Sequence, residues 1–269
     1  MVDIEADLPQ PFCLIMSQLP PTMYQPTKSD LMPPLALLAG GLATRLRPLT
    51  ETIPKSLVNV ADEPFIGHQL RLLTREGITE IVICTGHLGE QIETYVGDGS
   101  RWGCHVRYSA DGDRPLGTGG ALRRALPLLG DRFFVMYGDS YLNIHFRPVY
   151  EVFCRSGLPA LMTVFRNEGR WDGSNVEFAD GFIRSYDKAE RTPAMRHIDY
   201  GLGIFAAHLV RACPANTPFD LADLYSDLVR RRLLAGFEVQ QRFYEIGSPA
   251  GLAETDAFLR RVSAARDHS

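Results

Sequence analysis

The sequence predicts an α/β fold in which a mostly parallel sheet is flanked by helices. Short apolar runs alternate with amphipathic segments over the first 160 residues, and this rhythm is typical of β-α-β units. Glycines follow several of the apolar runs, as expected where strands end in ligand-binding turns. Beyond residue 160 the strand-like segments are more frequent, which predicts a smaller β-rich part.

The elements of the first half follow from apolar runs and from apolar residues spaced three and four apart. We expect strands at 35–39, 80–85, 106–109, 133–137 and 160–165. We expect helices at 65–76, 88–96, 120–129 and 148–155. Gly77 and Gly97 follow two of these helices, where glycine commonly ends a helix.

The elements of the second half are shorter. We expect strands at 175–178, 182–186, 200–205, 237–241 and 243–246. An amphipathic helix is expected at 221–234 with Asp220 as its N-cap. A closing helix at 249–261 is expected because Ser248 and Pro249 suit the N-cap and the first helical position.

Composition and charge exclude several classes of protein. The chain has 269 residues, 45% of them hydrophobic and 22% charged, with a formal net charge of −4, so it shows no basic footprint for nucleic acid. No apolar run reaches the roughly 18 residues that a membrane span needs. Five scattered cysteines without a C-x-x-C pair favour reduced thiols and a cytoplasmic location. Residues 1–32, rich in Pro, Gln, Ser and Thr, predict a poorly ordered extension, and Met32 is a candidate start of translation.

The segment 35–55 is the most informative part of the chain. An apolar strand runs into Gly40 and Gly41, whose backbone N–H groups can face an anion. Arg45 and Lys55 add fixed positive charge downstream. Neither the Walker pattern G-x-x-x-x-G-K-[ST] nor the dinucleotide fingerprint G-x-G-x-x-G is present here. The segment therefore predicts a polyphosphate site of another kind.

The ordered motifs of the chain resemble those of the sugar-1-phosphate nucleotidylyltransferases. They are A-G-G-x-x-T-R-L-R-P-L-T at 39–50, P-K-S-L at 54–57, P-L-G-T-G-G-A at 115–121, Y-G-D-S at 137–140, D-K at 187–188, D-Y-G at 199–201 and Y-E-I-G-S-P at 244–249. The resemblance implies a Rossmann-like fold of the nucleotide-diphospho-sugar transferase type. It also implies one domain at 33–262, with a nucleotide-binding half at 33–158 and a sugar-binding half at 159–262.

The resemblance further implies a reaction and the residues that carry it. An NTP and a sugar 1-phosphate would give an NDP-sugar and pyrophosphate, with Mg²⁺ as cofactor. The expected catalytic residues are Arg45, Lys55, Asp139 and Lys188. Nucleotide contacts are expected from Ala39, Gly40, Gly41, Thr44, Gly86, Leu116, Gly117 and Thr118. Sugar-phosphate contacts are expected from Gly138, Asn175, Glu177, Lys188, Asp199 and Tyr200. Asp139 and Glu245 are the expected metal ligands, because Mg²⁺ takes one or two carboxylates together with phosphate oxygens.

The resemblance leaves the substrates and the activity of this chain open to several alternatives. Ala43 stands where the family usually has Gly, Glu245 where most relatives have Asp, and Asp199 where many have Asn. The motifs at 115–121 and 138–140 favour GTP with manno-heptose or mannose 1-phosphate. The alternatives are UTP with glucose or N-acetylmuramic acid 1-phosphate, a phosphocholine cytidylyltransferase, and a non-catalytic regulatory homologue. Asp111 and Asp113 are expected to be solvated turn residues, Trp171 is a candidate for sugar stacking with core packing as its default, and homo-oligomerisation is left open.

Overall fold

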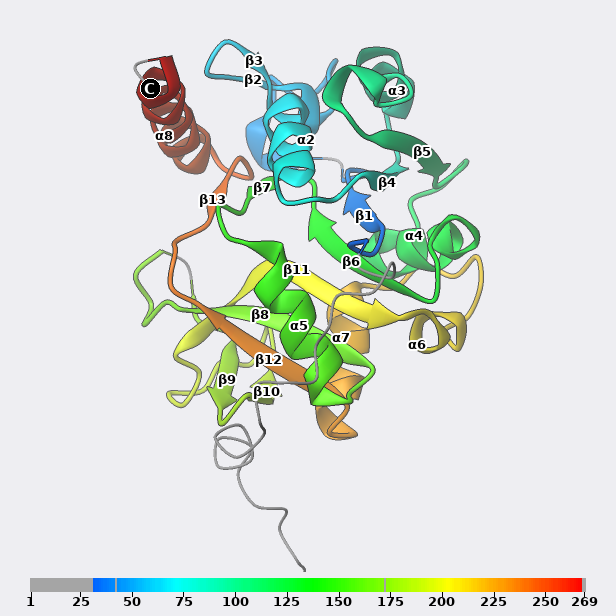
Figure 1. Ribbon diagram of the computed structural model, residues 1–269, viewed down its shortest axis with the longest axis vertical. Coiled ribbons are helices and arrows are strands. Elements are labelled where there is room, and N and C mark those ends of the chain that lie inside the picture. Colours follow the sequence, from blue (N-terminus) through cyan, green and yellow to red (C-terminus); the bar gives the residue numbers. More distant parts are fainter. Residues whose placement is uncertain (1–30, 42, 172, 268–269) are drawn as a thin grey trace, which may run out of the picture.

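The computed structural model describes residues 31–41, 43–171 and 173–267. Within these residues a nine-stranded sheet forms the centre of the molecule (Figure 1). In spatial order its strands are β5 (His105–Ala110), β4 (Glu80–Thr85), β1 (Leu35–Leu38), β6 (Arg132–Tyr137), β11 (His197–Ala206), β8 (Ala160–Arg166), β12 (Leu234–Val239), β10 (Phe182–Tyr186) and β9 (Val176–Ala179).

The sheet is parallel in its first part and mixed in the rest. Strands β5, β4, β1 and β6 run parallel, with Leu35 of β1 paired to Ile81 on one side and Phe134 on the other. β11 is antiparallel to both β6 and β8, whereas β12 is parallel to β8. Because β1, β4, β5 and β6 point the same way, their carboxyl ends meet at one edge, where ligands bind in folds of this kind.

Helices cover both faces of the sheet. On one face lie α2 (Phe65–Arg75), α3 (Gly89–Val96) and α5 (Phe146–Ser156), and on the other lie α4 (Gly117–Ala125), α6 (Ala207–Arg211) and α7 (Leu221–Arg230). Successive side chains of β1 alternate between the two cores: Leu35 and Leu37 join the first, and Ala36 and Leu38 the second. Such strands are buried on both faces, which explains their continuous apolar sequences.

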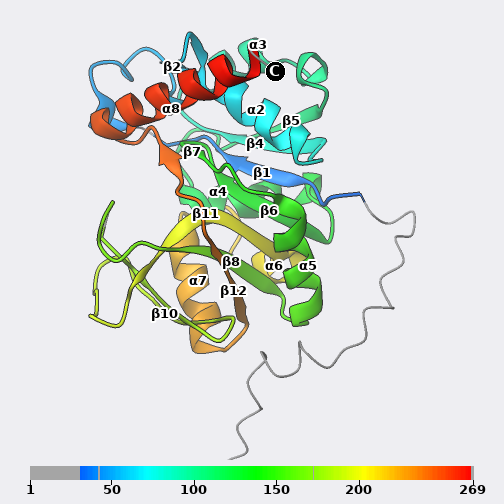
Figure 2. The ribbon, with the colours of Figure 1, turned by 60° about the vertical axis from the view of Figure 1, so that its left-hand side comes forward.

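The end of the chain returns to the first half. Helix α8 (Pro249–Asp267) lies alongside α2 and the hairpin of β2 (Asn59–Val60) and β3 (Glu63–Pro64) (Figure 2). Leu259 of α8 packs in one apolar cluster with Phe65 and Leu72. Ahead of α8, β13 (Tyr244–Glu245) pairs antiparallel with β7 (Ser140–Tyr141). This pairing brings Glu245 beside the turn that carries Asp139.

Most predicted strands and helices are present, and the differences are local. The helix predicted at 221–234 ends at Arg230, because Arg232 takes a left-handed backbone (φ 57°) and Leu234 begins β12 opposite Ala160. The helix predicted at 120–129 begins earlier, at Gly117. Helix α6 and the short hairpins are too short to show a periodicity in the sequence. Of the poorly ordered extension predicted at residues 1–32, residues 1–30 lie outside the described residues, whereas Met32 is buried in the core, against the prediction. None of the described helices has the length and apolarity to cross a bilayer.

Candidate active site

The floor of the site is backbone, at the carboxyl ends of three neighbouring strands. Gly40, Gly86 and Gly138 follow β1, β4 and β6. A Cβ on Gly86 would lie 2.6 Å from the carbonyl oxygen of Gly40, and one on Gly138 would lie 2.6 Å from that of Leu38. Side chains at 86 and 138 would therefore separate the strands, and their absence keeps this edge open for a ligand.

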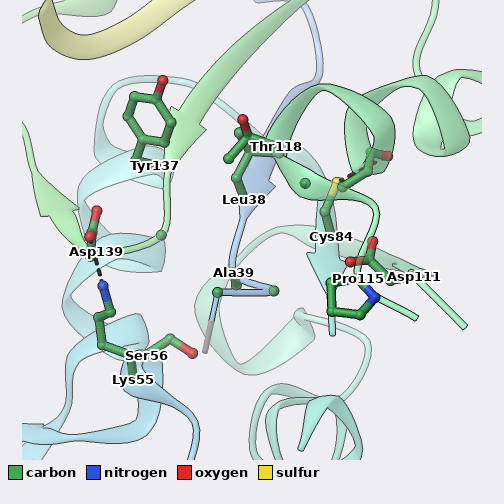
Figure 3. A pocket seen from close by; sticks show the side chains of 15 residues that line it. Leu38, Ala39, Lys55, Ser56, Cys84, Asp111, Pro115, Thr118, Tyr137 and Asp139 are labelled. Carbon is green, nitrogen blue, oxygen red and sulfur yellow. Dashed lines mark hydrogen bonds and ion pairs between the residues drawn. The ribbon is translucent and has the colours of Figure 1, made fainter. Parts of the chain in front are cut away.

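A cavity of about 240 Å³ lies over this floor (Figure 3). The predicted residues that line it are Ala39, Gly40, Gly41, Lys55, Gly117, Thr118, Gly138 and Asp139. Lys55 and Asp139 lie on one side, and Asp111, Pro115 and Cys84 on the other. A second cavity of about 540 Å³ shares Gly40, Asp111 and Pro115 with the first and adds Gly86, Arg47 and Arg114. The structure thus gathers most of the predicted nucleotide-binding residues around two adjoining cavities.

Lys55 and Asp139 form an ion pair at the cavity. The Lys55 Nζ lies 2.9 Å from Asp139 Oδ2, and the two side chains are 17% and 31% exposed. Lys55 comes from the short helical turn η2 (Lys55–Leu57), and Asp139 from the turn between β6 and β7. The Ser140 hydroxyl donates to the second carboxylate oxygen of Asp139 at 3.3 Å. A cation and a carboxylate are therefore fixed side by side, 84 residues apart in the sequence.

Arg45 lies near this pair, on the segment that follows β1. It belongs to the turn η1 (Thr44–Leu46), which is exposed at Thr44 and Arg45. The point where a Cβ on Gly247 would sit is near both side chains. It lies 3.7 Å from an Arg45 guanidinium nitrogen and 3.4 Å from Asp139 Oδ2. Arg45, Lys55 and Asp139 thus converge on one region, as the motif predicts.

Glu245 reaches the same region but is engaged by helix α8. Its Oε2 lies 2.6 Å from the same Gly247 point. Its carboxylate accepts hydrogen bonds from the backbone N–H of Gly247 and, at 2.8 Å, from the hydroxyl of Ser248. Ser248 in turn accepts from the N–H of Gly251 at 3.0 Å, in the first turn of α8. In this structure Glu245 therefore ties the start of α8 to β13.

The donor set near Asp139 suits a magnesium ion bound together with a substrate. Among the described residues, no three His, Cys, Asp or Glu side chains converge as a complete metal cage. The carboxylates of Asp139 and Glu245 both lie near the point where a Cβ on Gly247 would sit. Mg²⁺ is usually held by one or two carboxylates and completes its octahedron with water and phosphate oxygens, so these residues fit it.

Asp111 departs from the expectation of a solvated turn. Its side chain is buried, and its Oδ2 accepts a hydrogen bond from the N–H of Leu116 at 3.1 Å. Burial raises the pKa of Asp111, and the Leu116 bond and Arg124 oppose that rise. The carboxylate therefore shapes the loop from 111 to 116, whereas Asp113 is exposed as expected. The Leu116 side chain itself is buried, and it is not among the residues that line the two cavities.

Lys188 lies in the half predicted to bind the sugar and is linked through Asp220 to the start of α4. Its Nζ is 3.7 Å from Asp220 Oδ1 and 6.0 Å from the ring centre of Tyr137. The same Asp220 oxygen accepts from the Thr118 hydroxyl at 3.1 Å and from the Ala222 N–H at 2.8 Å. Asp220 is thus the N-cap of α7, as predicted, and it connects Lys188 with Thr118 in the first turn of α4.

Asp199 and Asn175, which are predicted to contact the sugar phosphate, are held by hydrogen bonds within the protein. Asp199 accepts from the Gly201 N–H at 3.0 Å and from the Tyr186 hydroxyl at 3.4 Å, and Asn175 Oδ1 accepts from the Asp199 N–H at 3.1 Å. Tyr200 is 1% exposed and meets Phe243 edge-to-face, so the structure does not bring it to the cavity. Glu177 lies on β9, at the far edge of the sheet. Trp171 is 48% exposed and stacks on the Arg242 guanidinium at 3.5 Å.

Sequence reasoning missed several residues that the structure places at the site, among them Tyr137, Cys84 and Gln69. Tyr137 and Cys84 line the cavity, and Gln69 of α2 donates to the carbonyls of Tyr137 and Ser140. For Gln69 a signal was present, since it is a polar residue on the apolar stripe of its helix. Cys84 carried no such signal, because it lies in a strand whose pattern indicates burial only. Tyr137 belongs to the Y-G-D-S motif, but the motif alone did not single it out.

Comparisons with known proteins identify the family of this chain. The model of the nucleotidyl transferase family matches residues 36–170. The N-acetylmuramate alpha-1-phosphate uridylyltransferase of Neisseria meningitidis is 32% identical over 82% of this chain and 96% of its own length. The UTP–glucose-1-phosphate uridylyltransferase of Synechocystis is 30% identical over 72% of this chain, which spans 54% of that relative.

The solved structures agree on the fold. HddC from Yersinia pseudotuberculosis complexed with GMP-PN superposes with a TM-score of 0.72, at 22% identity, over 85% of this chain and 100% of its own. The family match and the relatives confirm what the motifs predict: the chain belongs to the nucleotidyl transferase family and is an enzyme of the sugar-1-phosphate nucleotidylyltransferase class.

Proposed function

We propose that this enzyme transfers a guanylyl group from GTP to manno-heptose or mannose 1-phosphate and uses Mg²⁺. The observation that carries the chemistry is the convergence of Arg45, Lys55 and Asp139 at the open edge of the parallel strands. Reactions between two phosphates need positioning and cations more than a protein nucleophile. Lys55 supplies such a cation at the cavity, and Arg45 supplies another in the region of Asp139.

The reaction joins two anions and expels a third. An oxygen of the sugar phosphate attacks the α-phosphorus of GTP, a new P–O bond forms, and the bond from the α-phosphorus to the bridging oxygen breaks. In our proposal Arg45 faces the leaving pyrophosphate, Lys55 the α-phosphate and Lys188 the sugar phosphate. Asp139 and Glu245 would hold Mg²⁺, which supplies charge neutralisation on the phosphates. Fixed positive groups stabilise the charge that develops during transfer.

The lean towards GTP rests on the L-G-T-G-G motif and on the superposition with HddC, which was solved with GMP-PN. The two adjoining cavities, of about 240 and 540 Å³, give room for a purine nucleotide. A second candidate is UTP with N-acetylmuramic acid 1-phosphate, because the Neisseria relative is a uridylyltransferase of that sugar and matches nearly end to end.

The test is pyrophosphate release with four NTPs, each paired with mannose, manno-heptose, glucose and N-acetylmuramic acid 1-phosphates, with and without Mg²⁺. We expect release with GTP and one of the first two sugars, abolished in Asp139→Ala. Release with UTP alone would select the second candidate. Silence with every pair, in a protein that still binds nucleotide, would overturn both.

A further inference from the structure

Helix α2 carries one polar side chain on its buried stripe. Its buried positions include Phe65, Ile66, Leu70 and Leu73, and Gln69 lies among them with no exposed surface. A buried amide costs free energy unless its polar atoms are hydrogen-bonded. Gln69 Oε1 meets no partner in the described chain, whereas Nε2 makes two hydrogen bonds. Packing alone would favour an apolar side chain at position 69. The presence of an amide there therefore needs an explanation other than packing.

Both bonds go to the turn that carries Asp139. Gln69 Nε2 donates to the carbonyl oxygen of Tyr137 at 3.3 Å and to that of Ser140 at 2.9 Å. These two residues flank Gly138 and Asp139 at the carboxyl end of β6. One rigid amide on a packed helix therefore holds both ends of the turn.

Two further hydrogen bonds complete the fixation of this turn. The N–H of Gly138 donates to the carbonyl of Leu38 at 2.9 Å, and the N–H of Ile246 donates to the carbonyl of Asp139 at 2.9 Å. The turn is thus attached to β1, to α2 and to the segment after β13, while the Asp139 carboxylate faces Lys55 at 2.9 Å. The backbone is fixed by the fold, and only the side chain is left for the substrate.

We infer that Gln69 is a positioning residue, whose side-chain amide sets the Gly138–Asp139 turn so that the carboxylate meets Lys55 and the phosphates in working geometry. The inference rests on the proposed role of Asp139. A group misplaced by about 1 Å can cost a catalytic rate about 100-fold. Loss of a residue that orients a metal ligand typically costs about 10- to 100-fold.

The test compares Gln69→Met with two controls. Gln69→Met keeps length and burial but removes the donor. Gln91→Met makes the same chemical change on α3. The Gln91 amide donates a hydrogen bond of 2.9 Å to the carbonyl oxygen of Thr52, which is not part of the Gly138–Asp139 turn. Leu73→Ala destabilises the same helix without touching the turn. We expect Gln69→Met to lower kcat about 10- to 100-fold with a smaller change in KM for the nucleotide, and both controls to keep kcat in the folded protein.

Two readouts separate positioning from mere stability. Amide hydrogen exchange at Gly138 and Ile246 should accelerate in Gln69→Met and remain as in the wild type in Gln91→Met. In an Asp139→Asn background, Gln69→Met should cause no further fall in single-turnover rate, because it acts through the missing carboxylate. Multiplicative losses, or wild-type kcat and exchange in Gln69→Met, would overturn the inference. An inactive wild type would instead overturn the proposed function, and the exchange measurement would still decide on the turn.

Discussion

At the scale of the residue, Ala43 shows how a departure from the family motif is tolerated. It adopts a left-handed backbone (φ 50°, ψ 40°) directly before the turn that carries Arg45. Its carbonyl accepts from the Thr50 hydroxyl at 2.8 Å and from the Leu46 N–H at 3.1 Å, and these bonds hold the strained conformation. Such a backbone costs a residue with a Cβ about 1–2 kcal/mol, which explains why glycine is usual at this position.

We therefore predict that Ala43→Gly raises the free energy of unfolding. The relief of backbone strain exceeds the extra entropy of glycine in the unfolded chain, so the expected gain is up to about 1 kcal/mol. Turnover should stay within about two-fold of the wild type, because Arg45 keeps its backbone support. Urea denaturation measures the first quantity and pyrophosphate release the second. A destabilised variant would show that Ala43 is not strained.

Asp199 predicts a dependence of stability on pH. Burial raises its pKa above the ordinary 3.8, although the Gly201 N–H and Lys188 oppose the rise. The folded chain then holds this proton more tightly than the unfolded chain, so the contribution of Asp199 to stability falls as pH rises from 3.8 through its folded pKa. Asp199→Asn removes the effect and keeps an acceptor for Gly201. The stability gain of the variant over the wild type should grow from pH 3.8 towards neutrality in denaturant titrations, and a gain that shrinks over that range would contradict this.

The residues of the site differ in how far the sequence could predict them. Gly40 and Asp139 could be placed because their motifs follow strand ends, and parallel strands end at one edge. Lys55 lies on η2 and could be placed only through the resemblance to the family. Tyr200 could not be placed from the sequence. It lies in an irregular part of β11, and the sequence does not show which face of such a strand a side chain occupies. Asp111 looked like a turn residue, and only the fold shows that its carboxylate is buried against Leu116.

At the scale of the element, the start of α8 is attached to the site through Glu245. The carboxylate accepts from the Gly247 N–H and the Ser248 hydroxyl, where the positive end of the helix dipole favours an anion. The sequence could predict the helix and Ser248 as its N-cap. It could not predict the added contact, which forms because the Glu245 side chain is long enough to fold back onto Gly247 and Ser248. The shorter Asp of most relatives would have less reach towards Ser248.

This contact gives a prediction for the helix. Glu245→Ala should lower the free energy of unfolding by about 0.5–2 kcal/mol, the usual cost of losing a helix N-terminal acceptor. Glu245→Asp, the matched control, keeps the charge and should lose less. Thermal unfolding of both variants measures the difference. If Glu245→Ala unfolds like the wild type while its activity falls, the carboxylate serves a metal ion and not the helix.

At the scale of the whole molecule, the two halves predicted from the motifs share their surfaces. β11 from the sugar half pairs with β6 along Met136 to Arg132, and Phe205 stacks on Phe133 with ring centres 6.4 Å apart. The last helix crosses back to cover Phe65 and Leu72 of the nucleotide half. The sequence could predict the β-rich second part but not these pairings, because they join segments far apart in the chain.

The shared surfaces predict that the halves do not fold separately. A fragment of residues 31–158 would leave the apolar strand β6 as an open edge and expose the cluster that α8 covers, and such edges favour aggregation. We expect this fragment to lack a cooperative unfolding transition and to bind no nucleotide, whereas co-expression with residues 159–267 should restore both. Circular dichroism during heating and nucleotide binding by calorimetry measure these outcomes. A fragment that unfolds cooperatively on its own would show instead that the nucleotide half is an independent domain, on which the sugar half was built as an addition.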